Sequence, residues 1–578
     1  MRKMRFRTLI SVLTATTLMA GMLTGCQSKN TEDPTKPQET GGTATSDTSA
    51  STDGGEGNQD VVYDYFDPSQ VTEPITIEYM KKLDEELEWK DKTDPITLDV
   101  FYNAPAGYEY PGWGNDMVSQ EITNRTGVSL NFTFAQTTEN EQLNTLMASN
   151  KLPDLIVTSD NAIRAKLIDE EMVYSLDELI DQYCPRFRTI IPKRQNILFT
   201  EADGKMYTLA NWFGDPQMMK DIKGRLPAGA GLVINKEMYA ELGRPKMDTL
   251  DEYFDVLMMA KEKWPDMPYY VFDSYNGMDD LISRIYGGQN VKVIEDDKVH
   301  MNFRDESYQN AIKFINKLYR AGLYNPENFA VTSEQYVEAI KNNKIFSHWG
   351  WCANIMAYDM TMDTVYEVVE VPEVEGYEYR ITDMTGSMGL GSVYISKNCK
   401  DPERAILFLE FLASMEGQLL NYYGVEDRDF TIEEGVCRRS DEIEAARADF
   451  SKFTQEYGIV LGMNNLGVVG NFIDHNGYYW SGKTNPLYNG LYKYEDEARD
   501  EFINTCITIP AGDTEMAVVE SNIMKLWQTY RPKFFLAESE EACMEEYNKF
   551  IKEAESIGLN DLEEAYTTRY LELKNAGF

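Results

Sequence analysis

The chain has 578 residues, and its Asp and Glu residues outnumber its Lys and Arg residues by 96 to 55, which gives a formal net charge of −41 at neutral pH. A surface this acidic repels nucleic acid and anionic lipid, which argues against either as the main partner. A chain this long exceeds what one hydrophobic core holds, so two lobes are expected.

The first 25 residues are typical of an export signal. Four basic residues precede position 8, an apolar segment follows, and the segment ends in Leu23-Thr24-Gly25 before Cys26. This ending resembles the lipobox of bacterial lipoproteins, in which the chain is cut before the cysteine and the thiol is acylated. The resemblance predicts Cys26 as the mature N-terminus and lipid anchor. The alternative is a plain secretory signal with an incidental cysteine.

Residues 26–93 contain the lipidated cysteine, a tether and a charged lead-in. Residues 27–60 hold no Val, Ile, Leu, Met or aromatic residue, so they are predicted to be a flexible tether. No role can be assigned to Trp89 in the lead-in. No later segment approaches the roughly 18 uninterrupted apolar residues that a membrane span requires. The body is therefore expected outside the cell, held at the extracellular face of the cytoplasmic membrane by its lipid anchor only.

The body opens with an α/β pattern. Residues 94–101 alternate as in a strand, a helix ends at Gly127, and residues 128–132 form a second strand. A helix over 141–149 and a strand over 152–157 follow. This rhythm predicts a parallel sheet covered by helices, in which ligands bind beyond the carboxyl ends of the strands.

Six short motifs, spread over nearly the whole body, resemble extracellular solute-binding protein family 1. These are the carbohydrate-binding lipoproteins of ABC importers, relatives of maltodextrin-binding protein, and the resemblance is closest to the large lipoprotein branch of Gram-positive bacteria. The motifs are EITNRTGV at 121–128, LNTLMASNKLPDLI at 143–156, DGKMYTL at 203–209, VINKEM at 233–238, FINKLYRAGL at 314–323 and ISKNCKDPERA at 395–405.

The resemblance implies a periplasmic-binding-protein-like type II fold, with two α/β lobes and a ligand cleft between them. Lobe 1 would comprise residues 94–209 and 389–470, and lobe 2 would comprise 210–388 and the C-terminal helices of 471–578. The chain would cross between lobes near 209–212 and 388–392. The glycines at the second crossing suit a hinge, or they only end a strand.

Catalytic signatures are weak. The three histidines are widely separated, which argues against a histidine-ligated zinc site, and no G-x-S-x-G motif occurs. Residues 477–484 match the P-loop string, but Asn485-Pro486 would break the helix that a P-loop requires. Paired carboxylates of a glycosidase stay possible among 96 acidic residues. We expect no enzyme.

No cofactor or metal is expected either. Several relatives bind calcium in a loop that corresponds to residues 261–268, and most of the oxygen ligands are missing there. The cysteines after Cys26 are either free buried thiols or a set of disulfides, and their spacing does not decide between the two.

Sugar recognition needs flat apolar faces and planar polar groups. In the layout of the family, Trp113, Asp160, Asn161 and Trp212 would face the cleft. Trp480, in the aromatic run of the P-loop-like segment, is a further candidate. Trp264 and Trp527 are interpreted as packing residues.

The stretch IFSHWGWCANI at 345–355 places Trp349 and Trp351 on one face of a strand. It resembles the W-x-W-x-x-I segment of maltodextrin-type binders, except that Ile355 comes one residue late. The resemblance implies that one of the two tryptophans, with Trp349 slightly favoured, stacks on a sugar. The alternative is that both plug the core of the second lobe.

The predicted function is that of a monomeric substrate-binding lipoprotein of an ABC importer. It would capture a carbohydrate, expected to be an oligosaccharide, by lobe closure and deliver it to the transmembrane permease subunits. The alternatives are a lipid-anchored glycan sensor or surface glycan-retention protein on the same scaffold, and a peptide-binding importer component.

Overall fold

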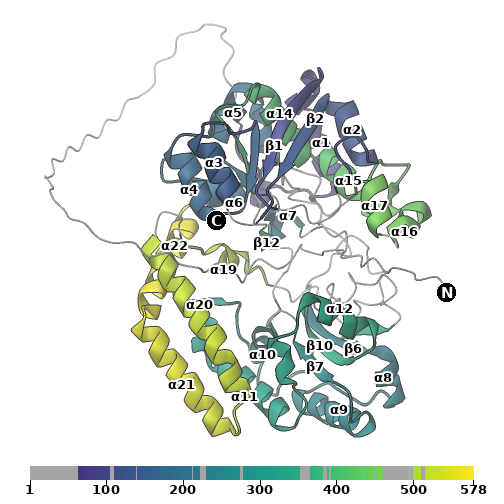
Figure 1. Ribbon diagram of the computed structural model, residues 1–578, viewed down its shortest axis with the longest axis vertical. Coiled ribbons are helices and arrows are strands. Elements are labelled where there is room, and N and C mark those ends of the chain that lie inside the picture. The colour runs from purple at the N-terminus through teal and green to yellow at the C-terminus, as the bar shows by residue number, and fades with distance from the viewer. Residues whose placement is uncertain are drawn as a thin grey trace, which may run out of the picture. The chain divides into compact units, whose positions relative to one another are not determined.

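The computed structural model describes residues 63–578 except 105–109, 138–139, 211–212, 220, 222–229, 274–276, 352–364, 382–386, 389–391, 434, 448–449, 460–493, 495–498 and 510–513. The secondary structure forms two separate α/β groups, each built around its own sheet (Figure 1). We call these groups the first and the second lobe.

The first lobe is built on a five-stranded sheet with the strand order β2-β1-β3-β13-β4. Strand β1 pairs in parallel with β2 on one side and with β3 on the other, as the alternation of strands and helices in the sequence predicted. Strand β13 runs antiparallel to both β3 and β4. The bounds are β1 Ile96–Tyr102, β2 Val128–Phe134, β3 Leu155–Thr158, β4 Leu209–Ala210 and β13 Ser392–Ile395.

Helices and a hairpin complete this lobe. Within it, α14 is buried from Arg404 to Ala413 and packs on α5 and α15. The helices are α1 Ile77–Asp84, α2 Met117–Thr126, α3 Glu141–Ala148, α4 Asn161–Asp169, α5 Leu176–Tyr183, α6 Lys193–Phe199, α14 Pro402–Ala413, α15 Met415–Tyr423, α16 Asp441–Arg447 and α17 Phe450–Glu456, and the hairpin is β14 Phe430–Glu433 with β15 Val436–Arg439.

Gly127 joins α2 to β2 in a way that only glycine allows. Its φ of 71° is left-handed, and its N–H donates to the carbonyl oxygen of Thr123, which ends the helix. A Cβ at this position would lie 2.1 Å from the backbone oxygen of Thr93. The helix therefore ends where the sequence predicted, and β2 begins at once beside β1.

The second lobe is built on a four-stranded sheet with the order β11-β6-β10-β7. Strand β10 runs parallel to β7 and antiparallel to β6. The bounds are β6 Ala230–Asn235, β7 Tyr269–Asp273, β10 Ile345–Trp351 and β11 Tyr366–Val369, with helices α8 Lys236–Glu241, α9 Leu250–Lys263, α10 Met278–Ile285, α11 Glu306–Arg320 and α12 Ser333–Lys341 and a hairpin of β8 Lys292–Glu295 and β9 Lys298–Met301.

The C-terminal helices, yellow in Figure 1, pack on the second lobe. Both α20 and α21 contact α11, and α22 contacts β9. The apolar face predicted for α21 is present, with Tyr547 and Phe550 both buried. The bounds are α19 Phe502–Cys506, α20 Thr514–Phe535, α21 Glu540–Ser556 and α22 Leu559–Asn575.

Two chain segments that were predicted as crossings pair with one another. The short strand β5 (Phe213–Gly214) follows β4, and β12 (Ser387–Met388) precedes β13 and pairs antiparallel with β5. Ala210 pairs with Ser392 and Phe213 pairs with Met388. The helix α7 (Pro216–Met219) follows β5.

The lead-in before β1 belongs to the first lobe, although its sequence assigned it no role. The ring of Trp89 is 6% exposed and packs edge-on against Phe411 of α14, with centroids 4.8 Å apart. The cysteines within the described residues, Cys184, Cys399, Cys437, Cys506 and Cys543, are all buried and free. No helix in the described ranges has the length and apolar character of a membrane span.

Candidate functional site

A cluster of polar side chains lies beyond the carboxyl ends of β1 and β3. The Nδ2 group of Asn103 donates to Asn140 Oδ1 at 2.7 Å and to Thr158 Oγ1 at 3.2 Å. Asn140 Nδ2 in turn donates to Asp160 Oδ2 at 2.8 Å, and Asp160 Oδ1 accepts the backbone N–H of Ile163 at the start of α4. Parallel strands and a helix N-terminus thus bring three separate loops together at one edge of the sheet.

One atom of this cluster lacks a partner. Asn103 Oδ1 is buried and accepts no hydrogen bond from any residue that the structure describes. A buried acceptor left unpaired costs about 1–3 kcal/mol, so a donor that reaches it gains that free energy. A ligand hydroxyl is a donor of the right kind, because the amide groups of Asn103 and Asn140 already donate to other acceptors in the cluster.

Five partly buried aromatic rings form a cluster around β1 and β2. Phe132 stacks on Phe134 with centroids 5.5 Å apart, and Tyr110 packs edge-on against both rings. Trp113 lies 6.2 Å from Phe132, and Tyr102, which immediately precedes Asn103, lies 5.7 Å from Phe134. Tyr102 and Phe134 are the last residues of β1 and β2, so these two rings place apolar surface at the carboxyl ends of the strands.

The hydroxyls of these rings stay protonated. Burial raises the pKa of Tyr102 and of Tyr110, so each phenol carries its proton at neutral pH. The indole Nε1 of Trp113 donates to Thr123 Oγ1 at 2.9 Å, which fixes the ring on α2. The edge thus combines apolar faces with neutral polar groups.

The sequence located part of this edge. Asp160 lies inside the polar cluster, Asn161 is the exposed first residue of α4, and Trp113 is one of the five rings. The sequence did not single out Asn103, Asn140, Thr158, Tyr102 or Phe134. Asn103 follows the last residue of a predicted strand, and this position was the available signal, because the carboxyl ends of parallel strands meet at one edge.

Trp349 lies in the core of the second lobe. Its side chain is 1% exposed, Nε1 lies 3.1 Å from Tyr253 Oη and the ring packs edge-on against Tyr253 of α9. A ring enclosed in this way presents no face to a ligand, so its burial favours the core role that the sequence had left open. Trp351 is the last residue of β10 and pairs with Ala230. We therefore assign the predicted stacking role to Trp351, and this assignment stays a prediction.

The other predicted residues, Cys26, Trp212 and Trp480, lie outside the described residues, and so does the P-loop-like segment 477–484. No group of three His, Cys, Asp or Glu side chains that could hold a metal ion is present in the part of the chain that the structure describes.

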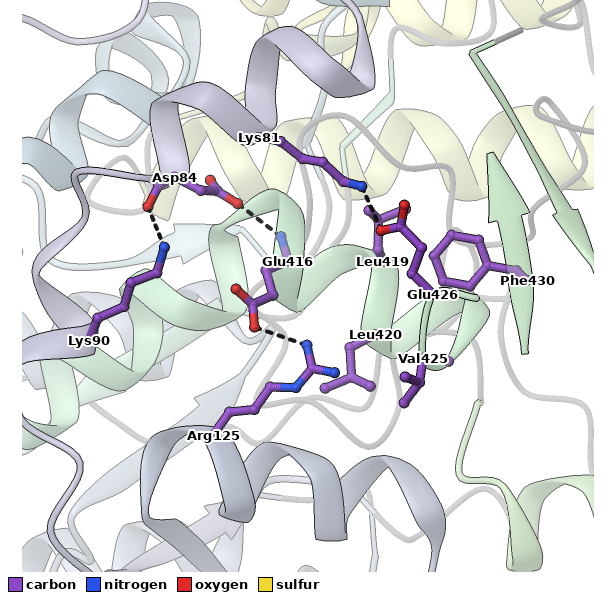
Figure 2. Close-up of a pocket in the computed structure, with 11 residues that line it drawn as sticks. Lys81, Asp84, Lys90, Arg125, Glu416, Leu419, Leu420, Val425, Glu426 and Phe430 are labelled. Atoms are coloured by element: carbon purple, nitrogen blue, oxygen red, sulfur yellow. Dashed lines mark hydrogen bonds and ion pairs between the residues drawn. The ribbon is translucent and has the colours of Figure 1, made fainter. Parts of the chain in front are cut away.

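A cavity of about 340 Å³ lies elsewhere in the first lobe (Figure 2). Its wall includes Arg125 near the end of α2, two residues before Gly127, so it lies toward the amino end of β2. Arg125 Nη1 pairs with Glu416 Oε1 at 2.9 Å, and Lys81 Nζ pairs with Glu426 Oε2 at 2.5 Å. These charges satisfy one another, and the cavity lies away from the strand ends where ligands bind in such sheets.

Burial raises the pKa of Asp84, at the rim of this cavity, to about 7. Its Oδ2 accepts the backbone N–H of Glu416 at 2.9 Å, which holds α1 against the N-terminus of α15. The carboxyl group therefore joins two helices of the first lobe.

Comparisons with known proteins agree with the fold. No family model matches the chain. The fructooligosaccharide ABC transporter substrate-binding protein FusA of Streptococcus pneumoniae serotype 4 is 26% identical over 256 residues, which cover 41% of this chain and 47% of that protein. Lipoprotein LipO of Bacillus subtilis is 22% identical over 333 residues, which cover 54% of this chain and 63% of LipO.

The crystal structure of S. pneumoniae FusA in complex with kestose superposes with a TM-score of 0.62 at 18% identity and covers 83% of this chain and all of that one. The chain is thus similar in sequence to two bacterial proteins, a substrate-binding protein of an ABC transporter and a lipoprotein. Its fold is the type II periplasmic-binding-protein-like fold that the motifs implied. The sequence matches span about half to two thirds of the length of these two curated relatives.

Proposed function

We propose that this chain is the substrate-binding component of an ABC importer and that it captures a carbohydrate, in particular an oligosaccharide. The observation that carries the proposal is the edge formed by β1, β2 and β3. There, partly exposed aromatic rings end β1 and β2, and an Asn and Asp cluster with one buried amide oxygen that lacks a partner among the described residues follows β1, β2 and β3. Pyranose and furanose rings have one apolar C–H side and several hydroxyl donors, which match these two kinds of group.

The relatives support the same ligand class. The name of FusA specifies fructooligosaccharides, and its structure was solved with kestose. The edge here offers neutral hydroxyls, amides and one carboxylate that is already engaged by Asn140 and Ile163. A neutral oligosaccharide is the ligand that meets these groups without burying an unpaired charge.

The proposed ligand-binding residues come from both lobes. In the first lobe they are Trp113, Asp160 and Asn161 together with Asn103, and in the second lobe the proposed stacking ring is Trp351. Trp212 and Trp480 are also proposed as ligand-binding residues, from the sequence alone. The lobe boundaries, with crossings near 209–212 and 388–392, are part of the same proposal.

The proposed mechanism is binding without bond formation. A ligand that contacts both lobes stabilises the closed form because only that form makes both sets of contacts. The paired crossing segments β4–β5 and β12–β13 are the proposed hinge. The closed form would dock as a monomer on the permease subunits, with Cys26 as a lipid anchor at the extracellular face of the membrane.

A thermal shift experiment tests the proposal. The purified chain is heated with kestose, with a panel of maltooligosaccharides and other neutral oligosaccharides, and with a panel of short peptides. Binding to the native state raises the midpoint of unfolding, and the stabilisation grows with the logarithm of ligand concentration over Kd once the ligand is in excess. We expect a rise with at least one oligosaccharide. A rise with peptides and with no glycan would contradict the carbohydrate assignment.

A further inference from the structure

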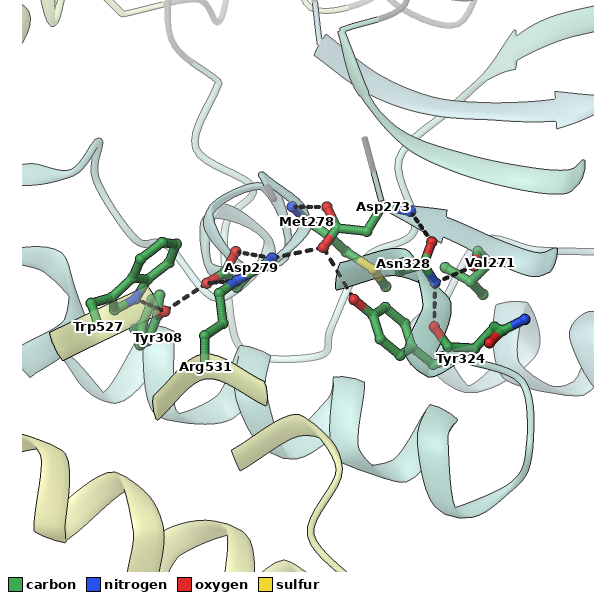
Figure 3. A network of polar contacts seen from close by, with 10 residues as sticks. Val271, Asp273, Met278, Asp279, Tyr308, Tyr324, Asn328, Trp527 and Arg531 are labelled. Carbon is green, nitrogen blue, oxygen red and sulfur yellow. Dashed lines mark hydrogen bonds and ion pairs between the residues drawn. The ribbon is translucent and has the colours of Figure 1, made fainter. Parts of the chain in front are cut away.

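A buried arginine links the C-terminal helix α20 to the sheet of the second lobe. The side chain of Arg531 is 2% exposed, and its Nη2 lies 2.7 Å from Asp273 Oδ2 and 3.0 Å from Asp279 Oδ1. Asp273 is the last residue of β7, and Asp279 lies in the first turn of α10. Figure 3 shows that the arginine approaches both carboxylates from the helix.

Every carboxylate oxygen in this network accepts at least one hydrogen bond. Asp273 Oδ2 also accepts from the hydroxyl of Tyr324 at 3.3 Å, and Asp273 Oδ1 accepts the backbone N–H of Met278 at 3.1 Å. Asp279 Oδ2 accepts from Tyr308 at 2.6 Å, and Tyr308 accepts from the indole of Trp527 at 2.8 Å. A fully satisfied buried network fixes its members in one arrangement.

Stability alone is a weak reason for such a network. Removing two carboxylates and one guanidinium from water costs several kcal/mol per ion, and apolar replacements of similar volume are often as stable. Two carboxylates share one guanidinium in this network, and desolvation raises the pKa of Asp273. The charged groups do fix the orientation of the side chains, because the planar guanidinium meets each carboxylate at a defined angle.

The network lies at the carboxyl end of β7. In the pairing of β10 with β7, Asp273 is the partner of Trp349, and Trp351 follows two residues later at the end of β10. In open α/β sheets this end of the strands faces the ligand. Arg531 therefore holds the strand end that lies beside the proposed stacking tryptophan.

We propose that Arg531 is a positioning residue for ligand binding: from α20 it fixes Asp273 and thereby the carboxyl end of β7 beside Trp351. This inference rests on the proposed carbohydrate-binding function. It gives the C-terminal helices a part in the binding site that their sequence did not reveal. Arg531 touches no ligand in this proposal and acts through Asp273.

The variant Arg531→Lys keeps the buried positive charge and loses the planar fork. Its matched control is Arg304→Lys. Arg304 also ties the second lobe to the C-terminal helices, through Glu563 at 2.8 Å and Glu555 at 2.9 Å, and it has no contact with β7 among the described residues. Both variants lose an arginine fork that joins the same parts of the chain, and Arg304 is the more exposed of the two, so the affinity loss of each variant is compared with its own loss of stability.

Two measurements are made on the full purified chain. Hydrogen exchange of the Met278 amide, which donates to Asp273, is followed without ligand. Calorimetric titration is then performed with kestose, or with the oligosaccharide that gives the largest thermal shift. We expect faster Met278 exchange and an affinity loss of about tenfold for Arg531→Lys, with both quantities near wild type for Arg304→Lys.

The proposal is overturned if Met278 exchange in Arg531→Lys equals that of wild type, or if both variants lose affinity in proportion to their lost stability. If the wild-type chain binds no oligosaccharide, the proposed function fails, and the exchange measurement still decides whether Arg531 fixes the end of β7.

If Arg531→Lys does not fold, Asp273→Asn replaces it. An Asn amide must turn its NH2 group toward either Met278 N–H or Arg531, so it loses one of the two anchors. The same rise in exchange and the same affinity loss are expected, and wild-type values for both would contradict the proposal.

Discussion

Trp113 and Trp349 carry the same side chain in two different environments. Trp349 of β10 packs against α9 and is 1% exposed. Trp113 is partly exposed and belongs to the aromatic cluster of the first sheet. Both indole nitrogens lie within hydrogen-bonding distance of a side-chain hydroxyl. The difference between a core residue and a candidate ligand contact therefore depends on ring exposure alone.

Alanine substitutions separate the two roles. We expect Trp349→Ala to lower the free energy of unfolding by about 3–5 kcal/mol, because it leaves a cavity in the core, and to leave the affinity of the folded fraction close to wild type. Trp113→Ala is expected to cost less stability and to weaken oligosaccharide binding about three- to tenfold. Denaturant unfolding and calorimetric titration measure the two quantities. A Trp349→Ala chain of normal stability and reduced affinity would reverse the assignment.

At the level of elements, the lead-in is joined to α14 by a buried carboxyl group. Glu410 of α14 is fully buried, and its Oε2 accepts the backbone N–H of Trp89 at 2.6 Å. Burial, reinforced by the neighbouring Glu88, raises the pKa of Glu410 to about 9. The group therefore holds a proton in the folded chain at neutral pH and can donate it to Glu88.

This raised pKa predicts how stability depends on pH. Between the ordinary glutamate pKa of 4.5 and the folded value of about 9, the folded state holds a proton that the unfolded state has lost. The stabilisation is complete below the lower value and is lost as pH rises through the upper one. We expect the unfolding free energy of wild type to fall more steeply from pH 5 to pH 9 than that of Glu410→Gln.

The measurement is a series of denaturant titrations across that pH range. The control is Glu538→Gln, which removes an exposed carboxylate and should leave the wild-type slope unchanged. Parallel pH profiles for wild type and Glu410→Gln would show that Glu410 does not hold the extra proton.

For the whole molecule, the sequence predicted strands and helices better than it predicted contacts between residues that are distant in the chain. Alternation and a C-terminal glycine were enough to place β1, α2 and β2, because these signals depend on neighbouring residues. Asp160 was identified because it follows a strand directly. Asn103 and Asn140 were not, because they meet across 37 positions of the chain in loops whose course no local pattern specifies.

The two tryptophans of β10 show the same limit. Strand alternation puts Trp349 and Trp351 on one face, so it cannot rank them. The burial of Trp349 depends on Tyr253, which lies 96 positions earlier. The sequence did not predict the role of Trp89 for a related reason. The surrounding lead-in is charged and gives no apolar pattern, and Trp89 packs on a helix more than 300 positions away in the chain.

The most direct test of the central claim is an affinity measurement at the edge of the first sheet. Asn103→Ala removes the amide whose buried Oδ1 lacks a partner among the described residues, and Asn131→Ala removes an exposed amide of the same sheet that donates to Asp99. Each variant and the wild type are titrated calorimetrically with kestose or with the oligosaccharide that gives the largest thermal shift.

We predict that the wild-type chain binds, that Asn103→Ala loses affinity by about tenfold or more, and that Asn131→Ala binds as wild type does. Equal affinities for all three chains would contradict the assignment of this edge as the binding site.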